Sequence, residues 1–443
     1  MRLEKLSLSN MRLFGKPGIC IDFEKDKNIA IFLGDNGSGK TTIMDSIINL
    51  LSPFMSEFPG SSITQFSDSD IHKVDRLHIA DSLTVEADIE TESGNVTHVI
   101  RSRRGMTDPE RATDLRGIKE YAESIISCVK DGRSVEFPLI AYYGTGRGYL
   151  QMPERRRNFA DVFERWDAYI GAPQPDTDFK RFINWYDLQE DDERREKINR
   201  NDINYESPSL NVVRSALSSF MGKRCSNPRI LNKPLRFVVD ETLDDGTMRE
   251  LRLEEMSDGY KIVIAMVADI ASRMIEANPV SNGSNPLEAS GIILIDEVDL
   301  HLHPKWQRKI LNQLSKTFPN IQFIVTTHSP IIVIGAAEIA QVINLNNYGS
   351  NPDACDERPF VSNVGQVLLS DLFGLPSLQS PKWDKKIDER DRLLAQAVLS
   401  ADDEKRLAQL DDEMKDLTYL QNSYSIRSSK ILEKLAQKFE LEL

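Results

Sequence analysis

Alternating hydrophobic and polar positions divide the N-terminal part of the chain into short strands and one helix. Strand-like runs lie at residues 2–10, 19–23 and 28–34, and the third run leads directly into a glycine-rich loop. In the segment that follows, hydrophobic residues recur at helical spacing: Ile43, Ile47, Ile48 and Leu51. The pattern therefore predicts a strand, a loop and a helix in succession.

The central part of the chain changes from antiparallel to helical and then to α/β patterns. Hairpins are predicted with turns at residues 93–95 and 245–246, and a highly charged helical segment lies between them at about 155–225. From residue 291 onward, strands and helices alternate again. This alternation is typical of a parallel α/β core.

The C-terminal region begins with a segment rich in turn residues, 349–381, and continues as a helical tail. Leu407, Leu410, Met414 and Leu417 are spaced three, four and three residues apart, as in a seam between packed helices. The seam is too short for a long coiled coil. We therefore expect a helical hairpin that docks on another surface.

Composition narrows the class of protein. Of the 443 residues, 40% are hydrophobic, which suits a large folded core. No apolar run approaches the roughly 18 residues of a membrane span, and the N-terminus is charged where a signal peptide is apolar, so we expect a cytoplasmic protein without membrane contact. Four scattered cysteines lack the paired spacing of a zinc or redox motif and are expected to be reduced thiols: Cys20, Cys128, Cys225 and Cys355.

The charge balance limits how the protein can contact nucleic acid. Lys and Arg number 55 against 69 Asp and Glu, so the net charge is −14 and the average surface repels DNA. Any DNA contact must therefore be local. Two basic clusters are candidates, Arg101, Arg103 and Arg104 in one and 155–157 in the other, although charge runs are more often solvated turns or helix faces.

The segment "GDNGSGKTT" matches the phosphate-loop pattern G-x-x-x-x-G-K-[ST]. Its glycines let main-chain amides crowd around phosphates, Lys40 would reach the β and γ oxygens, and Thr41 would bind magnesium. The match lies between a predicted strand and a predicted helix, which is the context that the motif requires. The sequence thus predicts a site for ATP and Mg²⁺ at Gly34, Asp35, Asn36, Gly37, Ser38, Gly39, Lys40, Thr41 and Thr42.

Two later strands end in polar residues that suit the same chemistry. Asp296 and Glu297 follow the apolar run "IILI", at the strand end where parallel sheets bind ligands. Asp296 is expected to hold the metal through water, and Glu297 to act as general base on the attacking water. His328 ends the next apolar strand and is expected to contact the γ-phosphate.

Ser257, Asp258 and Gly259 precede an apolar helix, and two interpretations apply to them. The first is an ordinary N-cap, whose side-chain oxygen accepts from free amides of the helix. The second is another anion site, because a helix N-terminus carries free amides and a positive dipole end. One chain cannot aim both helix N-termini at the same γ-phosphate, whereas two chains arranged head to tail can. The segment is therefore predicted to act in trans.

These motifs, in this order, resemble those of the SMC/RecF-like branch of ABC ATPases over about residues 1–345. The resemblance implies an α/β fold, an ABC-type P-loop ATPase head with flanking antiparallel β-hairpins, an inserted helical lobe and a C-terminal helical tail. It also implies that Arg12 reaches the nucleotide and that Gln151, the nearest candidate for the Q-loop, faces the metal. Two positions depart from common patterns, Asp258 where transporters have Gly and His303 where an Asp is common.

The resemblance divides the chain into four regions. The first ATPase lobe, with the phosphate loop, is expected at 1–150, and the helical lobe at 151–234. The second ATPase lobe, with the signature, the acidic pair and the histidine, is expected at 235–348. The linker and the helical tail, a docking element for a partner, follow at 349–443.

More narrowly, "YYGTGR", "SDGYK", "IDEVDLHLHPKWQ" and "FPNIQFIVTTHSP" resemble the PtuA-type ATPases of Septu- and retron-linked antiphage systems. This resemblance implies a homodimer or higher oligomer of heads that regulates a separately encoded HNH nuclease of the PtuB type. A reverse transcriptase or retron nucleic acid is a further candidate partner. The chain itself is expected to hydrolyse ATP and to have no nuclease site of its own.

Alternative functions remain open from the sequence. A RecF-like DNA-repair ATPase would bind DNA directly, which the net charge disfavours and the basic clusters keep open. A nuclease of the overcoming-lysogenization type would need a metal-dependent domain, but no His follows His328 and the tail shows helical seams. The long insertion and charged tail disfavour a transporter subunit. His301 and His303 suggest a metal site less well than a dimer-interface loop, since zinc takes three or four ligands.

Overall fold

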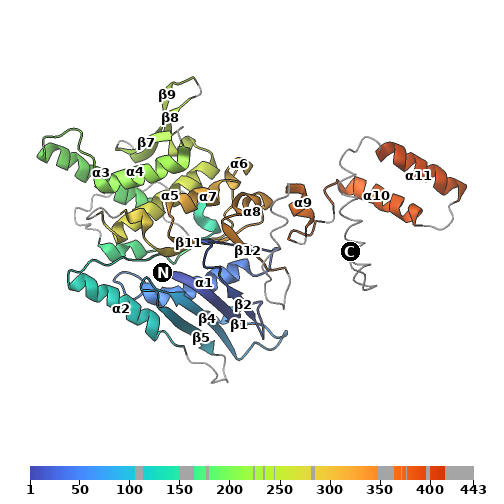
Figure 1. Ribbon diagram of the computed structural model, residues 1–443, viewed down its shortest axis with the longest axis horizontal. Helices are drawn as coiled ribbons and strands as arrows, with labels where there is room; N and C mark the ends of the chain where they lie inside the picture. Colours follow the sequence, from blue (N-terminus) through green and yellow to red (C-terminus); the bar gives the residue numbers. More distant parts are fainter. Residues whose placement is uncertain are drawn as a thin grey trace. The chain divides into compact units, whose positions relative to one another are not determined.

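The computed structural model divides the chain into two units, Met1–Phe360 and Val361–Leu443, which we describe separately (Figure 1). Gln151, the basic cluster at 155–157 and Leu417 lie outside the residues that the structure describes. The described residues are 1–104, 113–148, 164–175, 179–222, 225–232, 235–243, 245–280, 285–346, 364–370, 372–375, 377–395 and 400–414.

A five-stranded parallel sheet forms the centre of the first unit, in the order β12-β3-β11-β10-β6. Every residue of β3, β6, β10 and β11 is buried, as expected for a parallel sheet that is covered on both faces. The predicted parallel α/β core is therefore confirmed. Its strands are β3 (Ile29–Leu33), β6 (Leu139–Tyr143), β10 (Gly291–Ile295), β11 (Ile321–Thr326) and β12 (Ala340–Asn344).

A four-stranded antiparallel sheet, β2-β1-β4-β5, lies beside α1 in the blue part of Figure 1. The predicted hairpin with its turn at 93–95 is present, and the Thr91 N–H closes it on the Asn95 carbonyl at 2.9 Å. The elements of this part are β1 (Arg2–Ser9), β2 (Ile19–Asp22), β4 (Ser82–Glu90), β5 (Val96–Arg104), α1 (Lys40–Met55), α2 (Arg116–Lys130) and the 3-10 turn η1 (Asp68–Asp70).

The basic cluster on β5 is part of the fold rather than a solvated turn or helix face. Arg101 is buried and donates to the carbonyls of Asn49 and Thr64 and to the Ser52 hydroxyl. Burial lowers the pKa of Arg101 to about 10. Arg103 donates to the Phe66 carbonyl and to Asp68. These two guanidinium groups hold the segment after α1 in place.

The helical segment packs with a three-stranded sheet, β7-β8-β9, whose outer hairpin projects at the top of Figure 1. The predicted turn at 245–246 is confirmed, but the sequence interpretation of 151–234 as helical is wrong for β7. A strand there depends on pairing with β8, because "CSNPRILN" has no clear alternation of its own. The elements are η3 (Arg165–Tyr169), α3 (Phe179–Asn199), α4 (Pro208–Met221), β7 (Cys225–Asn232), β8 (Leu235–Thr242), β9 (Met248–Arg252) and η5 (Leu253–Glu255).

The remaining helices of the first unit complete the cover of the parallel sheet. Helix α5 (Asp258–Ala277) is buried along nearly its whole length from Ile262 onward. The segment after residue 304 forms two helices, which are divided at Arg308 and Lys309. The other elements are η2 (Thr145–Gly148), η6 (Pro286–Glu288), α6 (Pro304–Gln307), α7 (Ile310–Thr317) and α8 (Pro330–Ala336).

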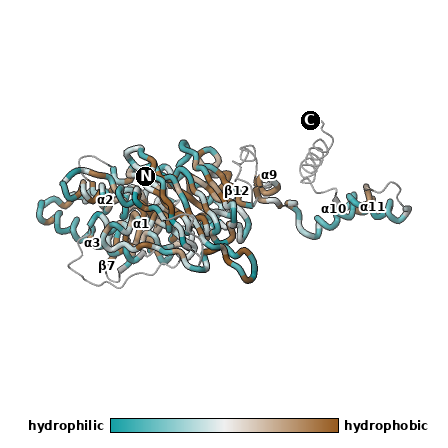
Figure 2. The backbone as a smooth tube through the Cα atoms, turned by 90° about the horizontal axis from the view of Figure 1, so that it is seen from below, coloured by the Kyte–Doolittle hydropathy of each residue, from teal (hydrophilic) through white to brown (hydrophobic). Residues whose placement is uncertain are grey.

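The second unit contains α9 (Val364–Leu369), α10 (Pro381–Leu394) and α11 (Ala401–Met414). Helices α10 and α11 form the predicted hairpin, with Leu410 buried between ion pairs Arg390–Asp411 (2.5 Å) and Arg406–Glu389 (2.8 Å). Figure 2 shows that both helices are mainly hydrophilic with interspersed apolar positions. Among the helices of the described segments, none combines the length and apolar character that crossing a membrane requires.

Candidate functional site

The phosphate loop connects the buried strand β3 to α1. The Lys40 ammonium lies inside the loop and donates to the main-chain carbonyls of Gly34 (2.7 Å) and Asp35 (2.9 Å). Gly39 has φ +97°, and a Cβ there would lie 2.6 Å from Cζ of Phe14, so glycine is required. Burial lowers the pKa of Lys40, although Asp296 and Glu297 act in the opposite direction.

The loop before β2 covers the phosphate loop and positions Arg12. Phe14 contacts Gly39, and the Arg12 guanidinium forms ion pairs with Asp45 (2.7 Å) on α1 and Asp70 (2.9 Å). Burial acts to lower the pKa of Arg12, but these two carboxylates outweigh it and raise the pKa. Arg12 is therefore a fixed cation beside the first turns of α1. Its two carboxylate partners were not predicted from the sequence.

Asp296 meets Thr41 at the carboxyl ends of the central strands. The Thr41 hydroxyl donates to one carboxylate oxygen of Asp296 at 2.9 Å, which joins residues 255 positions apart. The Thr326 hydroxyl donates to the other oxygen at 2.5 Å, and the Asp296 N–H donates to the Tyr143 carbonyl at 2.8 Å. The structure thus brings together the two residues that were predicted to serve the same metal.

Glu297 takes an unusual main-chain conformation beside this pair. Its φ is +48°, and its N–H donates to the Thr326 hydroxyl at 2.7 Å. Thr326 therefore holds both acidic residues at once, a role that the sequence analysis missed. The signal in the sequence that could have indicated this role is a residue with a hydroxyl group at the last position of β11. Asp299 is held in a similar way by the Thr327 hydroxyl at 2.5 Å.

His328 lies two residues after the end of β11 and is exposed, whereas the Thr327 before it is buried. The next residue, Ser329, caps α8 by accepting from the Ile331 N–H at 3.2 Å. The histidine therefore lies between a buried strand and a capped helix. Its contact with the γ-phosphate stays a prediction.

The signature segment, residues 257–259, begins α5 on an exposed surface. Ser257 is the N-cap residue, yet its side chain makes no capping hydrogen bond, which removes the support for the ordinary capping interpretation. A Cβ on Gly259 would lie 2.5 Å from the His301 carbonyl, so the loop after β10 packs tightly against this position. Within the described residues, no hydrogen bond or ion pair joins the segment to the phosphate loop of its own chain.

The two histidines of that loop have structural roles. The His303 Nδ1 accepts from the Lys305 N–H at 3.2 Å and caps α6, while His301 has φ +61°. In the part of the chain that the structure describes, no group of three or more His, Cys, Asp and Glu side chains is arranged to hold a metal. The zinc alternative for this pair therefore lacks a third ligand.

A phosphate loop between a parallel strand and a helix, with a strand-end carboxylate on its threonine, defines a P-loop nucleotide-binding protein. Residues 5–206 match the family described as "AAA domain", and residues 141–334 match "AAA domain, putative AbiEii toxin, Type IV TA system". Both matches contain part of the site. They agree with the architecture, which confirms the predicted α/β P-loop head with flanking antiparallel hairpins.

At the level of sequence, the chain is similar to proteins named as retron ATPases and as a Septu protein. The chain is 27% identical to "Retron Vc95 probable ATPase" of Vibrio cholerae serotype O1 biovar El Tor, covering 83% of this chain and 78% of that one. It is 28% identical to "Retron Ec83 probable ATPase" of Escherichia coli, covering 74% and 69%. It is 38% identical to "Septu protein PtuA" of Bacillus mycoides (strain KBAB4), covering 28% and 17%. The predicted relationship to PtuA-type ATPases is thereby confirmed.

Among solved structures, the "SMC head domain from Thermotoga maritima" is similar at 17% identity, with a TM-score of 0.42, over 80% of this chain and 100% of that one.

Proposed function

We propose that this protein is an ATPase whose heads dimerise head to tail around ATP and thereby regulate a separately encoded effector nuclease in antiphage defence. The observation that carries the ATPase proposal is the contact of Thr41 with Asp296 next to Lys40 and Glu297. The names of the retron and Septu relatives support the defence role.

The side chains of the site fit ATP and magnesium. The Lys40 ammonium donates its two hydrogen bonds to loop carbonyls. A bound triphosphate would replace these carbonyls as the acceptor without breaking an ion pair. Thr41 and Asp296 present hard oxygen ligands, and magnesium sites commonly need only one or two protein groups besides phosphate and water. When bound, the metal neutralises charge on the transferred phosphoryl group. Gln151, outside the described residues, is proposed as a further residue on the metal side.

The proposed roles of the protein groups follow from their positions. Lys40 holds the β and γ oxygens, and the amides from Gly34 to Thr42 surround the phosphates. Glu297 accepts the proton of the attacking water. Its strained main chain is bonded to the Thr326 hydroxyl, which fixes the position of the Cα atom from which the side chain extends. His328 contacts the γ-phosphate, and Arg12 supplies a further cation from the covering loop.

The head-to-tail dimer is proposed because Ser257 and Asp258 are exposed at the N-terminus of α5. The Ser257 hydroxyl makes no capping bond, and Asp258 is exposed at the positive end of α5. The Ser257 hydroxyl and the positive end of α5 are suited to the γ-phosphate of a second chain, whereas the Asp258 carboxylate pairs with Lys261 at 3.2 Å. ATP with Glu297→Gln protein should give dimers by light scattering, and ADP should not. Monomers under both conditions would contradict the dimer.

The helical tail is proposed as the docking element for the effector nuclease, an HNH protein of the PtuB type, with a reverse transcriptase or retron nucleic acid as a further partner. The α10–α11 hairpin belongs to the second compact unit, Val361–Leu443, and buries Leu410. Deleting residues 382–443 should leave the ATPase rate unchanged and abolish co-purification with the effector. Full co-purification of the truncated protein would refute this role.

A RecF-like repair ATPase that binds DNA directly is less well supported. Arg101 and Arg103 are engaged inside the first unit, so they are not available to phosphates of DNA. The net charge of −14 also disfavours a broad DNA surface.

A further inference from the structure

Residues 72–80 form a short ordered hairpin that we call the apolar finger. Lys73 and Ile79 pair as an antiparallel bridge, and the Val74 N–H donates to the His78 carbonyl at 3.0 Å. At the tip, the Asp75 carboxylate accepts from the N–H groups of Leu77 (2.7 Å) and His78 (2.9 Å). The finger is therefore a defined structure and not an irregular loop.

The finger exposes three large hydrophobic side chains. Val74 is 63% exposed, Leu77 is 89% exposed and Ile79 is 52% exposed. Grouped hydrophobic side chains on a surface commonly mark an interaction site. Lys73 and Arg76 belong to the same finger, and neither has an ion-pair partner among the described residues. With the Asp75 carboxylate at its tip, the finger thus combines apolar contact area with a small net positive charge from Lys73 and Arg76.

The base of the finger is part of the nucleotide site. The His72 N–H donates to the Asn10 carbonyl at 2.9 Å, and the His72 Nδ1 lies 2.6 Å from the Arg12 carbonyl oxygen. Arg12 is in turn paired with Asp45 on the phosphate-loop helix. The finger therefore extends from the rim of the phosphate loop on a base that the Arg12 loop fixes.

A surface of matching chemistry flanks the signature. Glu254 and Asp258 are exposed on either side of Ser257; Asp258 pairs with Lys261 at 3.2 Å, and Glu254 has no ion-pair partner within the described segments. Directly after the signature, the rings of Tyr260 and Trp306 pack edge to face with centroids 5.0 Å apart, and both are only partly buried. This signature flank offers negative charge and aromatic contact area.

We propose that the apolar finger docks on the signature flank of a second copy of this chain. The proposal rests on the head-to-tail dimer described above. In that dimer, the signature of one copy must approach the phosphate loop of the other, so the rim of the loop faces the residues around the signature. Arg76 would then meet Glu254, while Leu77 covers the Tyr260–Trp306 pair.

The test compares two exposed hydrophobic residues in the full-length chain. Leu77→Ser should weaken dimerisation with a non-hydrolysable ATP analogue by roughly tenfold, the scale of losing one apolar anchor from an interface. Ile203→Ser is the matched control, because Ile203 is 84% exposed between α3 and α4. It should leave dimerisation unchanged. Both variants should bind the analogue as the unmodified chain does.

A charge reversal provides the second arm. Arg76→Glu should weaken dimerisation, and mixing it with Glu254→Lys chains should restore heterodimers. Equal dimerisation by Leu77→Ser, Ile203→Ser and the unmodified chain would overturn the finger while leaving the dimer intact. Failure of the unmodified chain to dimerise, or normal dimerisation of Ser257→Arg, would instead overturn the head-to-tail dimer. Loss of duplex DNA binding by Leu77→Ser, with dimerisation unchanged, would assign the finger to nucleic acid.

Discussion

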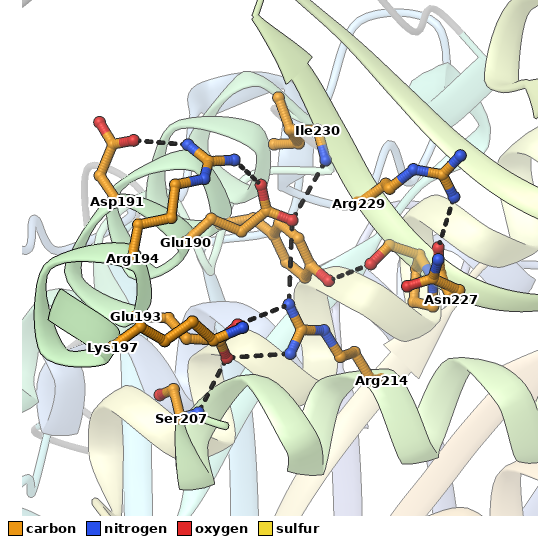
Figure 3. A network of polar contacts seen from close by, with 12 residues as sticks. Glu190, Asp191, Glu193, Arg194, Lys197, Ser207, Arg214, Asn227, Arg229 and Ile230 are labelled. Carbon is orange, nitrogen blue, oxygen red and sulfur yellow. Dashed lines mark hydrogen bonds and ion pairs between the residues drawn. The ribbon is translucent and has the colours of Figure 1, made fainter. Parts of the chain in front are cut away.

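The phosphate site and the charged network between α3, α4 and β7 use the same residue types in opposite ways. In the network of Figure 3, Glu193 accepts from the Ser207 N–H (2.8 Å) and from Arg214 (3.0 Å), and Glu190 accepts from Arg194 at 2.7 Å. Each of these two carboxylates has both a cation and a main-chain amide from nearby elements. The charges are neutralised within the fold.

At the phosphate site the arrangement differs. Lys40 donates to main-chain carbonyls, and the Asp296 carboxylate accepts from the hydroxyls of Thr41 and Thr326. The printed hydrogen bonds of these two side chains thus come from main-chain carbonyls and from hydroxyls, while Asp296 and Glu297 act on Lys40 through space. The comparison teaches that the lobe network is built on direct ion pairs, whereas the phosphate site positions its lysine and carboxylate mainly through main-chain and hydroxyl groups. Mutations in the two regions should consequently affect different quantities.

The largest expected effect is that of Lys40→Ala. Removing the ammonium should abolish ATP binding, because no other described cation lies within the loop. The free energy of unfolding should change little, since the lost bonds end on partly exposed loop carbonyls. Calorimetric titration with ATP and thermal unfolding measure the two quantities. An unchanged ATP affinity would refute the phosphate-loop assignment.

Glu297→Gln should separate binding from chemistry. The amide keeps the size of the side chain but cannot accept the proton of water, so turnover should fall by roughly 10²–10⁴-fold while ATP affinity is retained. Steady-state phosphate release and nucleotide titration check this. Glu288→Gln, at an exposed acid on η6 beside the start of β11 and so at the opposite end of that strand from Thr326, serves as control and should hydrolyse ATP normally. Turnover at the normal rate in Glu297→Gln would mean that another group activates the attacking water.

The charged network should respond in stability and not in ATP binding. Arg214→Met leaves the buried Glu193 without its principal cation and should lower the free energy of unfolding by about 3 kcal/mol. Arg195→Met breaks an exposed pair with Asp192 and should cost less than about 0.5 kcal/mol. Urea unfolding compares them. Equal stability of the two variants would show that the network is not stabilising.

The smallest expected effect is on the pH dependence of stability. Burial raises the pKa of Glu190 to about 7, despite Arg194. Because the native carboxyl holds its proton more tightly than the unfolded one, its stabilising contribution is complete below about pH 4.5 and is lost as the pH rises toward 7. Glu190→Gln should flatten this decline by roughly 1–3 kcal/mol between pH 5 and 8. An unchanged slope would mean that Glu190 stays ionised.

Glu193 provides the opposite sign within the same helix. Burial acts to raise the pKa of Glu193, but hydrogen bonds from Ser207 and Arg214 outweigh burial and lower this pKa. Its contribution is therefore present above the unfolded pKa and is lost as the pH falls through the lower native value. Glu193→Gln should change how the free energy of unfolding varies at acidic pH. It should leave the decline in that free energy toward pH 7 unchanged.

The sequence predicted those parts of the site that depend on local pattern. The phosphate loop follows a buried strand, and Asp296 and Glu297 end another, so both were identified from adjacent residues. Thr326 was missed because its role depends on β11 lying beside β10. Arg101 was misjudged for the same reason, since only the packed structure shows which carbonyls it bonds. Strand β7 likewise becomes recognisable only through its partner β8.

The central claim is that Ser257, Asp258 and Gly259 complete the site of a neighbouring chain. Ser257→Arg should leave ATP binding by a single chain intact but place a bulky side chain at the γ-phosphate, so turnover is lost. Lys40→Ala is inactive for a different reason. A mixed dimer contains one site with an intact loop and an intact signature, so mixing the two inactive chains should partly restore ATP hydrolysis. A flat, inactive profile across mixing ratios, where mixed dimers demonstrably form, would contradict the claim.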